Sequence, residues 1–184
     1  MADATEPSWA LLDAEAPPAD WLSARYPELR RMAAARLRGR AFHRTVGTTS
    51  LVHEAAVRII STNRREAIRD LRHFFATAAY AMRSAIVDHC RGRLAQKRNM
   101  RTSALLHDPA APTGDEQLLA LDAALEDLAK VDPLAAEFVK LRFFAGVSAD
   151  NAARCLGVSP RQGGRIWAFS RAWLAARLGE GGDA

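Results

Sequence analysis

Apolar side chains recur along this chain at helical spacing, and glycine, proline or short polar segments interrupt them. Leu29, Met32 and Ala33 form such a stripe, and Pro27 is suited to the first position of the helix that carries it. Strand-like alternation is scarce, so the pattern predicts an all-α protein. The expected helices cover residues 27–38, 48–62, 70–98, 117–128, 133–145, 149–156 and 160–178.

Changes in composition divide the chain into two small helical domains joined by a flexible linker. The linker is predicted at residues 102–116, which contain two prolines, a glycine and small polar side chains. We expect a first domain at 20–101 and a second at 117–178. Residues 1–19 form an acidic tail that we expect to be flexible, and residues 179–184 form a short C-terminal tail.

Charge is distributed unevenly, although the whole chain carries a formal net charge of only +5. Residues 21–101 hold 18 Lys and Arg against five Asp and Glu, whereas residues 102–150 hold three against nine. Two basic segments separated by an acidic one favour nucleic acid as a partner over a generic solvated surface. From charge alone, the acidic segments 1–20 and 102–116 are predicted to shield the basic faces in the free protein.

Several classes of protein are disfavoured. No apolar run is long enough to span a membrane and no signal-peptide layout is present, which predicts a cytoplasmic protein. Cys90 and Cys155 stand far apart and are expected to be reduced thiols. His53, His73 and His89 lack metal-ligand spacing. No catalytic motif is found, so we expect no metal, no cofactor and no enzymatic activity.

The C-terminal segment has the layout of a helix-turn-helix, in which Ser148 caps a short helix, Gly157 lies in the turn and a basic helix follows. Arg161, Gln162 and Arg165 stand near the start of that helix and are candidates for reading bases in the major groove. The remaining candidates in this segment, expected to contact phosphates, are Arg154 and Arg171. An ordinary helical hairpin remains an alternative.

Five sequence stretches give these patterns a more specific meaning. They read RYPELRRMAAARLR, TTSLVHEAAVRI, HFFATAAYAMRSAIVDHCRGRLAQKR, LAKVDPLAAEFVKLRFFAGVS, and LGVSP followed by RAWL. In this order, they resemble the extracytoplasmic-function sigma factors of bacteria. Residues 25–101 resemble the second conserved region of that family, and residues 117–178 resemble the fourth. The wording around TTSLVHEA resembles a subgroup with a Thr-rich segment in place of an acidic motif.

The resemblance implies a regulator of transcription initiation whose partners are core RNA polymerase and promoter DNA. The first domain would bind the clamp helices of the largest polymerase subunit and help open the minus-ten element, and the second would read the minus-thirty-five element. The implied clamp-binding residues are Leu51, Val52, Glu54 and Arg58. The residues of the long helix expected to face DNA are Arg83, His89, Arg91, Arg93, Lys97 and Arg98.

The sequence departs from that family in the segment before Leu51, where most members carry acidic residues. Here Thr48, Thr49 and Ser50 stand at a helix N-terminus. A phosphate on Thr48 or Thr49 would restore negative charge where the helix dipole favours it. One hypothesis is therefore activation by a Ser/Thr protein kinase. Simple helix capping by the hydroxyl groups is the alternative.

A second departure lies in the reading helix, where Gly163 and Gly164 occupy positions that are an apolar and a polar residue in most relatives. Each glycine weakens a helix, and Gly163 is expected to leave its core position unfilled. In the preceding helix, Asn151 and Ala152 replace a Glu and a larger apolar residue. Because of these changes, one alternative remains that the protein is a sigma-like adaptor, which binds polymerase or another protein without reading promoters. A stand-alone helix-turn-helix repressor would explain residues 117–178 but not the first domain.

Overall fold

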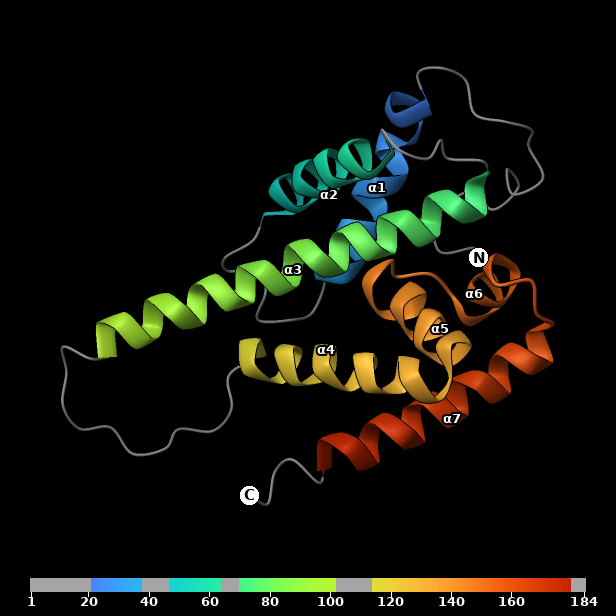
Figure 1. The fold of residues 1–184 in the computed structure, drawn as a ribbon. Coiled ribbons are helices and arrows are strands. Elements are labelled where there is room, and N and C mark those ends of the chain that lie inside the picture. Colours follow the sequence, from blue (N-terminus) through green and yellow to red (C-terminus); the bar gives the residue numbers. More distant parts are fainter. Residues whose placement is uncertain (1–20, 38–46, 64–69, 102–113, 180–184) are drawn as a thin grey trace.

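The computed structural model describes residues 21–37, 47–63, 70–101 and 114–179, and all regular structure within these ranges is α-helical (Figure 1). The all-α prediction is therefore confirmed. The predicted N-terminal tail, residues 180–184 at the C-terminus and most of the predicted linker lie outside the described residues. The helices are α1 (Trp21–Leu37), α2 (Thr48–Asn63), α3 (Leu71–Arg101), α4 (Gly114–Val131), α5 (Pro133–Phe144), α6 (Ala149–Cys155) and α7 (Pro160–Gly179).

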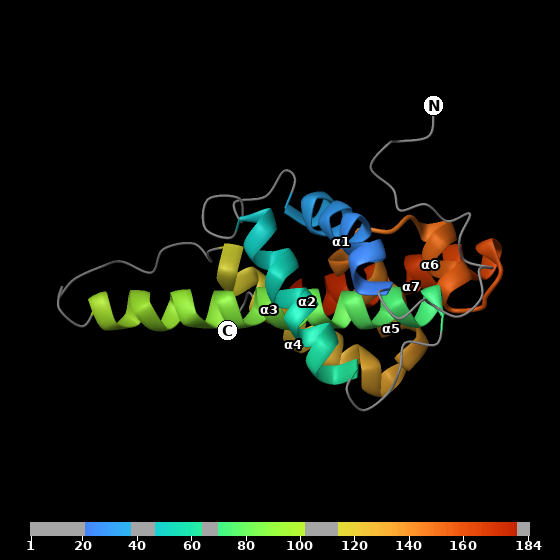
Figure 2. The ribbon, with the colours of Figure 1, turned by 90° about the horizontal axis from the view of Figure 1, so that it is seen from above.

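The long helix α3 runs through the middle of the molecule. Helix α2 packs along one side of it, and α4 and α5 pack along the other, while α1 packs against α2 and also touches α5 (Figures 1 and 2). Apolar side chains therefore point from α3 in several directions, and Phe74, Phe75, Met82 and Ile86 are fully buried. Ile59 of α2 is also fully buried, whereas its neighbour Ile60 is 46% exposed.

Helices α4 to α7 form the second helical group, and local sequence signals define their ends. Asp132 caps α5 by accepting a hydrogen bond from the Ala135 backbone N–H over 2.9 Å, and Pro133 takes the first helical position. Ser148 caps α6 in the same way, accepting from the Asn151 N–H over 3.3 Å. The Ser148 cap agrees with the sequence-based prediction.

Two predicted boundaries are wrong. Helix α1 begins at Trp21, so Pro27 lies inside the helix and not at its first position. A proline in a helix removes one backbone hydrogen bond, and here the helix continues through that loss. Helix α4 begins at Gly114, three residues before the predicted start at Gln117. Asp115 and Glu116 stand in its first turn, where negative charge is favourable, and they belong to the helix and not to a linker.

The two helical groups touch each other through α3. Helix α3 packs against both α4 and α5, and the buried apolar side chains of the two groups form one continuous cluster. Of the helices that the structure describes, none is long and apolar enough to cross a membrane.

Candidate nucleic-acid interface

The helix-turn-helix predicted from the sequence is present in α6, α7 and the turn between them. Gly157 adopts a φ of 69° in that turn, a left-handed conformation that favours glycine. Ser159 then caps α7 by accepting from the Gln162 backbone N–H over 3.2 Å. As a result Arg161, Gln162 and Arg165 stand exposed on the first turns of α7. This is the position from which a recognition helix reaches base edges.

Gly163 has a structural role that corrects the sequence-based expectation. A Cβ atom at this position would lie 2.8 Å from the Ala153 Cβ and 3.2 Å from the Phe138 ring. The core position is therefore already filled by these two neighbours, and glycine permits the close approach of α7 to α5 and α6. Gly164 is exposed and has open space around it. The close packing at Gly163 thus offsets its cost in helix propensity, whereas no packing contact offsets that of Gly164.

Aromatic packing holds α7 against α5. The Trp167 ring lies 6.4 Å from the Phe138 ring, centroid to centroid, and the guanidinium of Arg142 lies 4.7 Å above the indole. Trp173 is partly buried, whereas Phe169 is 43% exposed. Arg154 on α6 and Arg171 on α7 are exposed, as a phosphate contact requires.

The basic residues of α3 are placed differently, because α4 lies against them. Arg83 donates to the Asp122 carboxylate over 2.6 Å and also to Glu126. Burial alone would lower the pKa of Arg83, but the hydrogen bonds and charges of these two carboxylates raise it above its ordinary value. The same contact lowers the pKa of Glu126. Arg83 is therefore a charged, mostly buried side chain held by α4.

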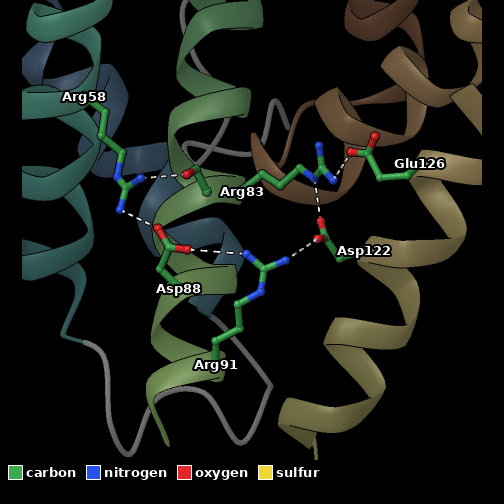
Figure 3. A network of polar contacts seen from close by, with 7 residues as sticks. Arg58, Arg83, Asp88, Arg91, Asp122 and Glu126 are labelled. Carbon is green, nitrogen blue, oxygen red and sulfur yellow. Dashed lines mark hydrogen bonds and ion pairs between the residues drawn. The ribbon is translucent and has the colours of Figure 1, made fainter. Parts of the chain in front are cut away.

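Other predicted DNA contacts on α3 are also engaged within the protein. Arg93 lies 3.3 Å from Asp115 at the start of α4, and Arg91 lies between Asp88 at 3.7 Å and Asp122 at 4.0 Å (Figure 3). Of the remaining predicted contacts on α3, His89 pairs with Glu54 of α2 over 3.0 Å, and Lys97 is exposed. The side chain of Arg98 lies outside the described part.

The residues implied as polymerase contacts on α2 face inward. Leu51 and Val52 have no exposed surface and contribute to the core. Arg58 donates to Ser84 over 2.6 Å and to Asp88 over 2.9 Å, both on α3, while Glu54 holds His89. The exposed face of α2 instead presents other side chains, namely Thr49, Ser50, His53, Val57 and Ile60.

The N-terminus of α2 has the features that the phosphorylation hypothesis requires of an accessible site. Thr49 and Ser50 are exposed, and the first turn contains no acidic side chain. The Gly47 carbonyl accepts the Leu51 N–H over 3.1 Å, which places Gly47 immediately before the helix. The side chain of Thr48 lies outside what the structure describes.

Sequence reasoning missed the carboxylates that hold the basic face of α3. Asp115, Asp122 and Glu126 are spaced by seven and four residues, which places them on one side of α4. That spacing was visible in the sequence, but acidic residues on an amphipathic helix ordinarily face water. Asp88 of α3, which joins Arg58 to Arg91, was missed as well (Figure 3).

Neither a metal site nor a reactive thiol marks the described part of the chain. Within it, no three His, Cys, Asp or Glu side chains gather closely enough to hold a metal ion. Cys90 is buried on α3, with its Sγ atom 3.6 Å from an Asp115 oxygen. Burial raises the pKa of the Cys155 thiol to about 11, which keeps it protonated and unreactive at neutral pH.

In a comparison with known protein families, residues 13–180 match the family model described as ECF sigma factor. The match covers both helical groups and nearly the whole chain. Comparisons with curated proteins and with solved structures gave no match.

Proposed function

Because the chain belongs to the ECF sigma factor family, we propose that it binds core RNA polymerase and directs it to promoters, with α7 reading duplex DNA. The observation that carries this proposal is the exposure of Arg161, Gln162 and Arg165 on the first turns of a capped helix that follows a tight turn. Arginine and glutamine side chains in this position make paired hydrogen bonds to base edges in the major groove. The close packing at Gly163 supports a well-formed reading helix and weakens the case for a degenerate adaptor.

The exposed face of α2 is the proposed contact with polymerase. Val57 and Ile60 are 51% and 46% exposed, an apolar pair on a helix whose other side is buried. An aliphatic pair of this kind suits a helix-on-helix contact, such as the family's contact with the polymerase clamp. Glu54 and Arg58 flank this surface, and their ion pairs with α3 set its position. A factor that works with polymerase is expected in the cytoplasm.

Transcription in vitro tests the proposal. Core polymerase and fragmented genomic DNA of the source organism are mixed with the protein, and transcript 5′ ends are sequenced. We expect wild type to direct initiation at sites sharing an upstream element. Arg161→Ala/Arg165→Ala should lose that element, because each bidentate contact contributes about 1–3 kcal/mol of base discrimination.

Arg177→Ala is the matched control, because Arg177 stands on the same helix but pairs with Asp127 of α4 over 3.1 Å. It should retain the upstream element. Initiation by wild type at the same sites as core polymerase alone would overturn the proposal. Binding to core polymerase without directed initiation would favour the adaptor, and binding to duplex DNA without any polymerase contact would favour a repressor.

Phosphorylation of Thr48 or Thr49 by a Ser/Thr kinase is proposed as a finer level of control. The support is the exposed Thr49, the absence of an acid in the first turn of α2, and the position of both residues at a helix N-terminus. A phosphate there gains from the helix dipole and from the free backbone N–H groups of the first turn. It would supply the negative charge that most relatives carry as acidic residues.

The measurement is the affinity of core polymerase for wild type, Thr49→Ala, Thr49→Glu and the protein treated with kinase. We expect tighter binding by Thr49→Glu and by the phosphorylated protein than by wild type. Thr62→Glu at the other end of α2 is the control for added charge. Equal binding and transcription by wild type and Thr49→Glu would leave helix capping as the role of these residues.

A further inference from the structure

Three carboxylates of α4 form a line that faces three arginines of α3. The line consists of Asp115, Asp122 and Glu126, and the arginines are Arg83, Arg91 and Arg93. The pairing runs antiparallel, because the first acid of α4 meets the last of the arginines on α3 (Figure 3 shows the part at Arg83 and Arg91). The acids come from the second helical group, and the bases come from the first.

These arginines are among the residues of α3 that the resemblance to sigma factors implies as contacts of promoter DNA, the partner in the proposed function. A carboxylate offers a guanidinium the same kind of paired, charged oxygen acceptors that a phosphate offers. While α4 is in place, Arg83 is only 10% exposed and Arg93 is about one-third exposed, so a DNA backbone has little access to either. Arg161 and Arg165 on α7, by contrast, are exposed in the same structure.

We propose that α4 is an internal substitute for nucleic acid, which holds the free protein closed and keeps the basic face of α3 from DNA until α4 moves away. The inference rests on the proposed function where it assigns a role to the arginines of α3. The contact between α3 and α4 is independent of that function. Of the acidic segments that the sequence analysis expected to shield the basic faces, the described part includes Asp115, whose carboxylate lies 3.3 Å from Arg93 of α3. The other two acids, Asp122 and Glu126, lie further along α4.

The contact is built so that it can separate. Glu126 and Arg91 keep more than half of their side-chain surface exposed, so a competing anion can approach the arginines from that edge. Twelve residues join Arg101 to Gly114, and a segment of that length can span up to about 40 Å. The connecting segment is therefore long enough for α4 to move away from α3 together with α5 to α7, against which it packs, although this movement also exposes apolar side chains shared by the two groups.

Cys90 provides a direct readout of this separation. It is fully buried on α3, on the same side of the helix as Arg83, and its Sγ lies 3.6 Å from Asp115 of α4. In a Cys155→Ser background, alkylation of Cys90 by iodoacetamide at pH 8 reports how often the contact opens. It requires neither DNA nor polymerase, so it tests the closed state independently of the proposed function.

The experiment compares wild type, Glu126→Gln and Asp122→Asn/Glu126→Gln in that background. The matched control is Asp127→Asn/Glu137→Gln, which removes the same charge from residues whose partners, Lys130, Arg177 and Lys140, lie outside α3. The second measurement is affinity for a random-sequence DNA duplex at low salt. Glu126→Gln, at an exposed position, keeps the test valid if the double variant folds poorly.

We expect Cys90 to react faster in both α4 variants and DNA to bind about 10-fold tighter to the double variant, because the apparent affinity rises with the fraction of open molecules. The control should match wild type in both measurements. Unchanged alkylation in both α4 variants, or equal gains in the control, would overturn the proposal. Faster alkylation without DNA binding by any variant would confirm the charge-held contact and overturn the assignment of α3 to DNA.

Discussion

The guanidinium of Arg83 donates to the carboxylate of Asp122 over 2.6 Å, and each side chain is only 10% exposed. Ion pairs this deeply buried lose hydration when they form, so they add less to stability than their short distance suggests. Removing only one of the two charges destabilises the protein strongly, because the remaining charge stays buried without a partner. Such a pair contributes little to overall stability but strongly favours one arrangement of α3 and α4.

Asp122→Asn should separate α4 from α3 more readily than it unfolds the protein. Removing one partner of a buried pair typically costs about 3–5 kcal/mol when the other charge cannot reach water. Here Arg83 regains water if α4 moves away, so the free energy of unfolding measured in urea should fall by less than about 3 kcal/mol. X-ray scattering of the same sample should show a larger radius of gyration.

Arg83→Met/Asp122→Leu is the control, because an apolar pair replaces both charges and should restore compactness and most of the stability. A loss above about 3 kcal/mol in Asp122→Asn with an unchanged radius of gyration would contradict a separable contact.

The two glycines of α7 should respond to alanine in opposite directions. Gly163→Ala places a Cβ atom 2.8 Å from that of Ala153, and overpacking of this kind costs about 1–3 kcal/mol, more than the roughly 1 kcal/mol of added helix propensity. Gly164→Ala meets open space, so it should stabilise the protein by about 0.5–1 kcal/mol. The midpoints of urea unfolding measure both effects. Stabilisation by Gly163→Ala would show that α7 does not approach α6 this closely.

Local sequence signals predicted the helices and their caps well. Asp132 with Pro133, Ser148 and Gly157 each mark a helix end through a mechanism confined to a few neighbouring residues. Such signals need no knowledge of distant contacts, which is why the helix-turn-helix could be drawn from residues 148–178 alone. The predicted start of α1 at Pro27 was wrong, because proline is favoured at the first position of a helix but can also occur inside one.

The contacts between distant residues could not be predicted in this way. Arg83 and Asp122 are 39 residues apart, and nothing local shows that the acidic side of α4 faces a basic helix instead of water. The same holds for Gly163, because glycine is needed there only on account of the Ala153 Cβ atom of the neighbouring helix. The resemblance to a family led to the expectation of DNA contacts on α3, but it carried no information on which residues of the protein itself pair with those arginines.

Cys155 should be almost inert toward alkylation, although it is not fully buried. Burial raises the pKa of its thiol to about 11, and only the thiolate reacts. At pH 8 the thiolate fraction falls roughly 100-fold below that of a thiol of ordinary pKa. Mass spectrometry of Cys90→Ser treated with iodoacetamide between pH 7 and 10 should show a rate that is still rising at pH 10. A plateau near pH 9 would show that the thiol is not shielded.

Acid should open the contact between α3 and α4, and Glu126 sets part of that response. The pKa of Glu126 lies below its ordinary value of 4.5 because of the hydrogen bond from Arg83, with smaller effects from Lys140 and Lys130. A carboxylate whose pKa is lowered in the closed form stabilises that form fully above its ordinary pKa, and the stabilisation is lost as the pH falls through the lowered value. Scattering from wild type should therefore show a compact protein from pH 7 down to about pH 4.5 and expansion below it.

The Glu126→Gln variant isolates the share of this one group. It should be less compact than wild type at pH 7, and the difference between the two proteins should shrink as the pH falls, because acid removes from wild type the charge that the variant lacks. Glu137→Gln, which loses a pair with Lys140 on α5, should follow the wild-type curve. If Glu126→Gln and wild type have the same radius of gyration at pH 7, Glu126 does not help to hold α4 on α3, and the contact depends on Asp122 and Asp115 alone.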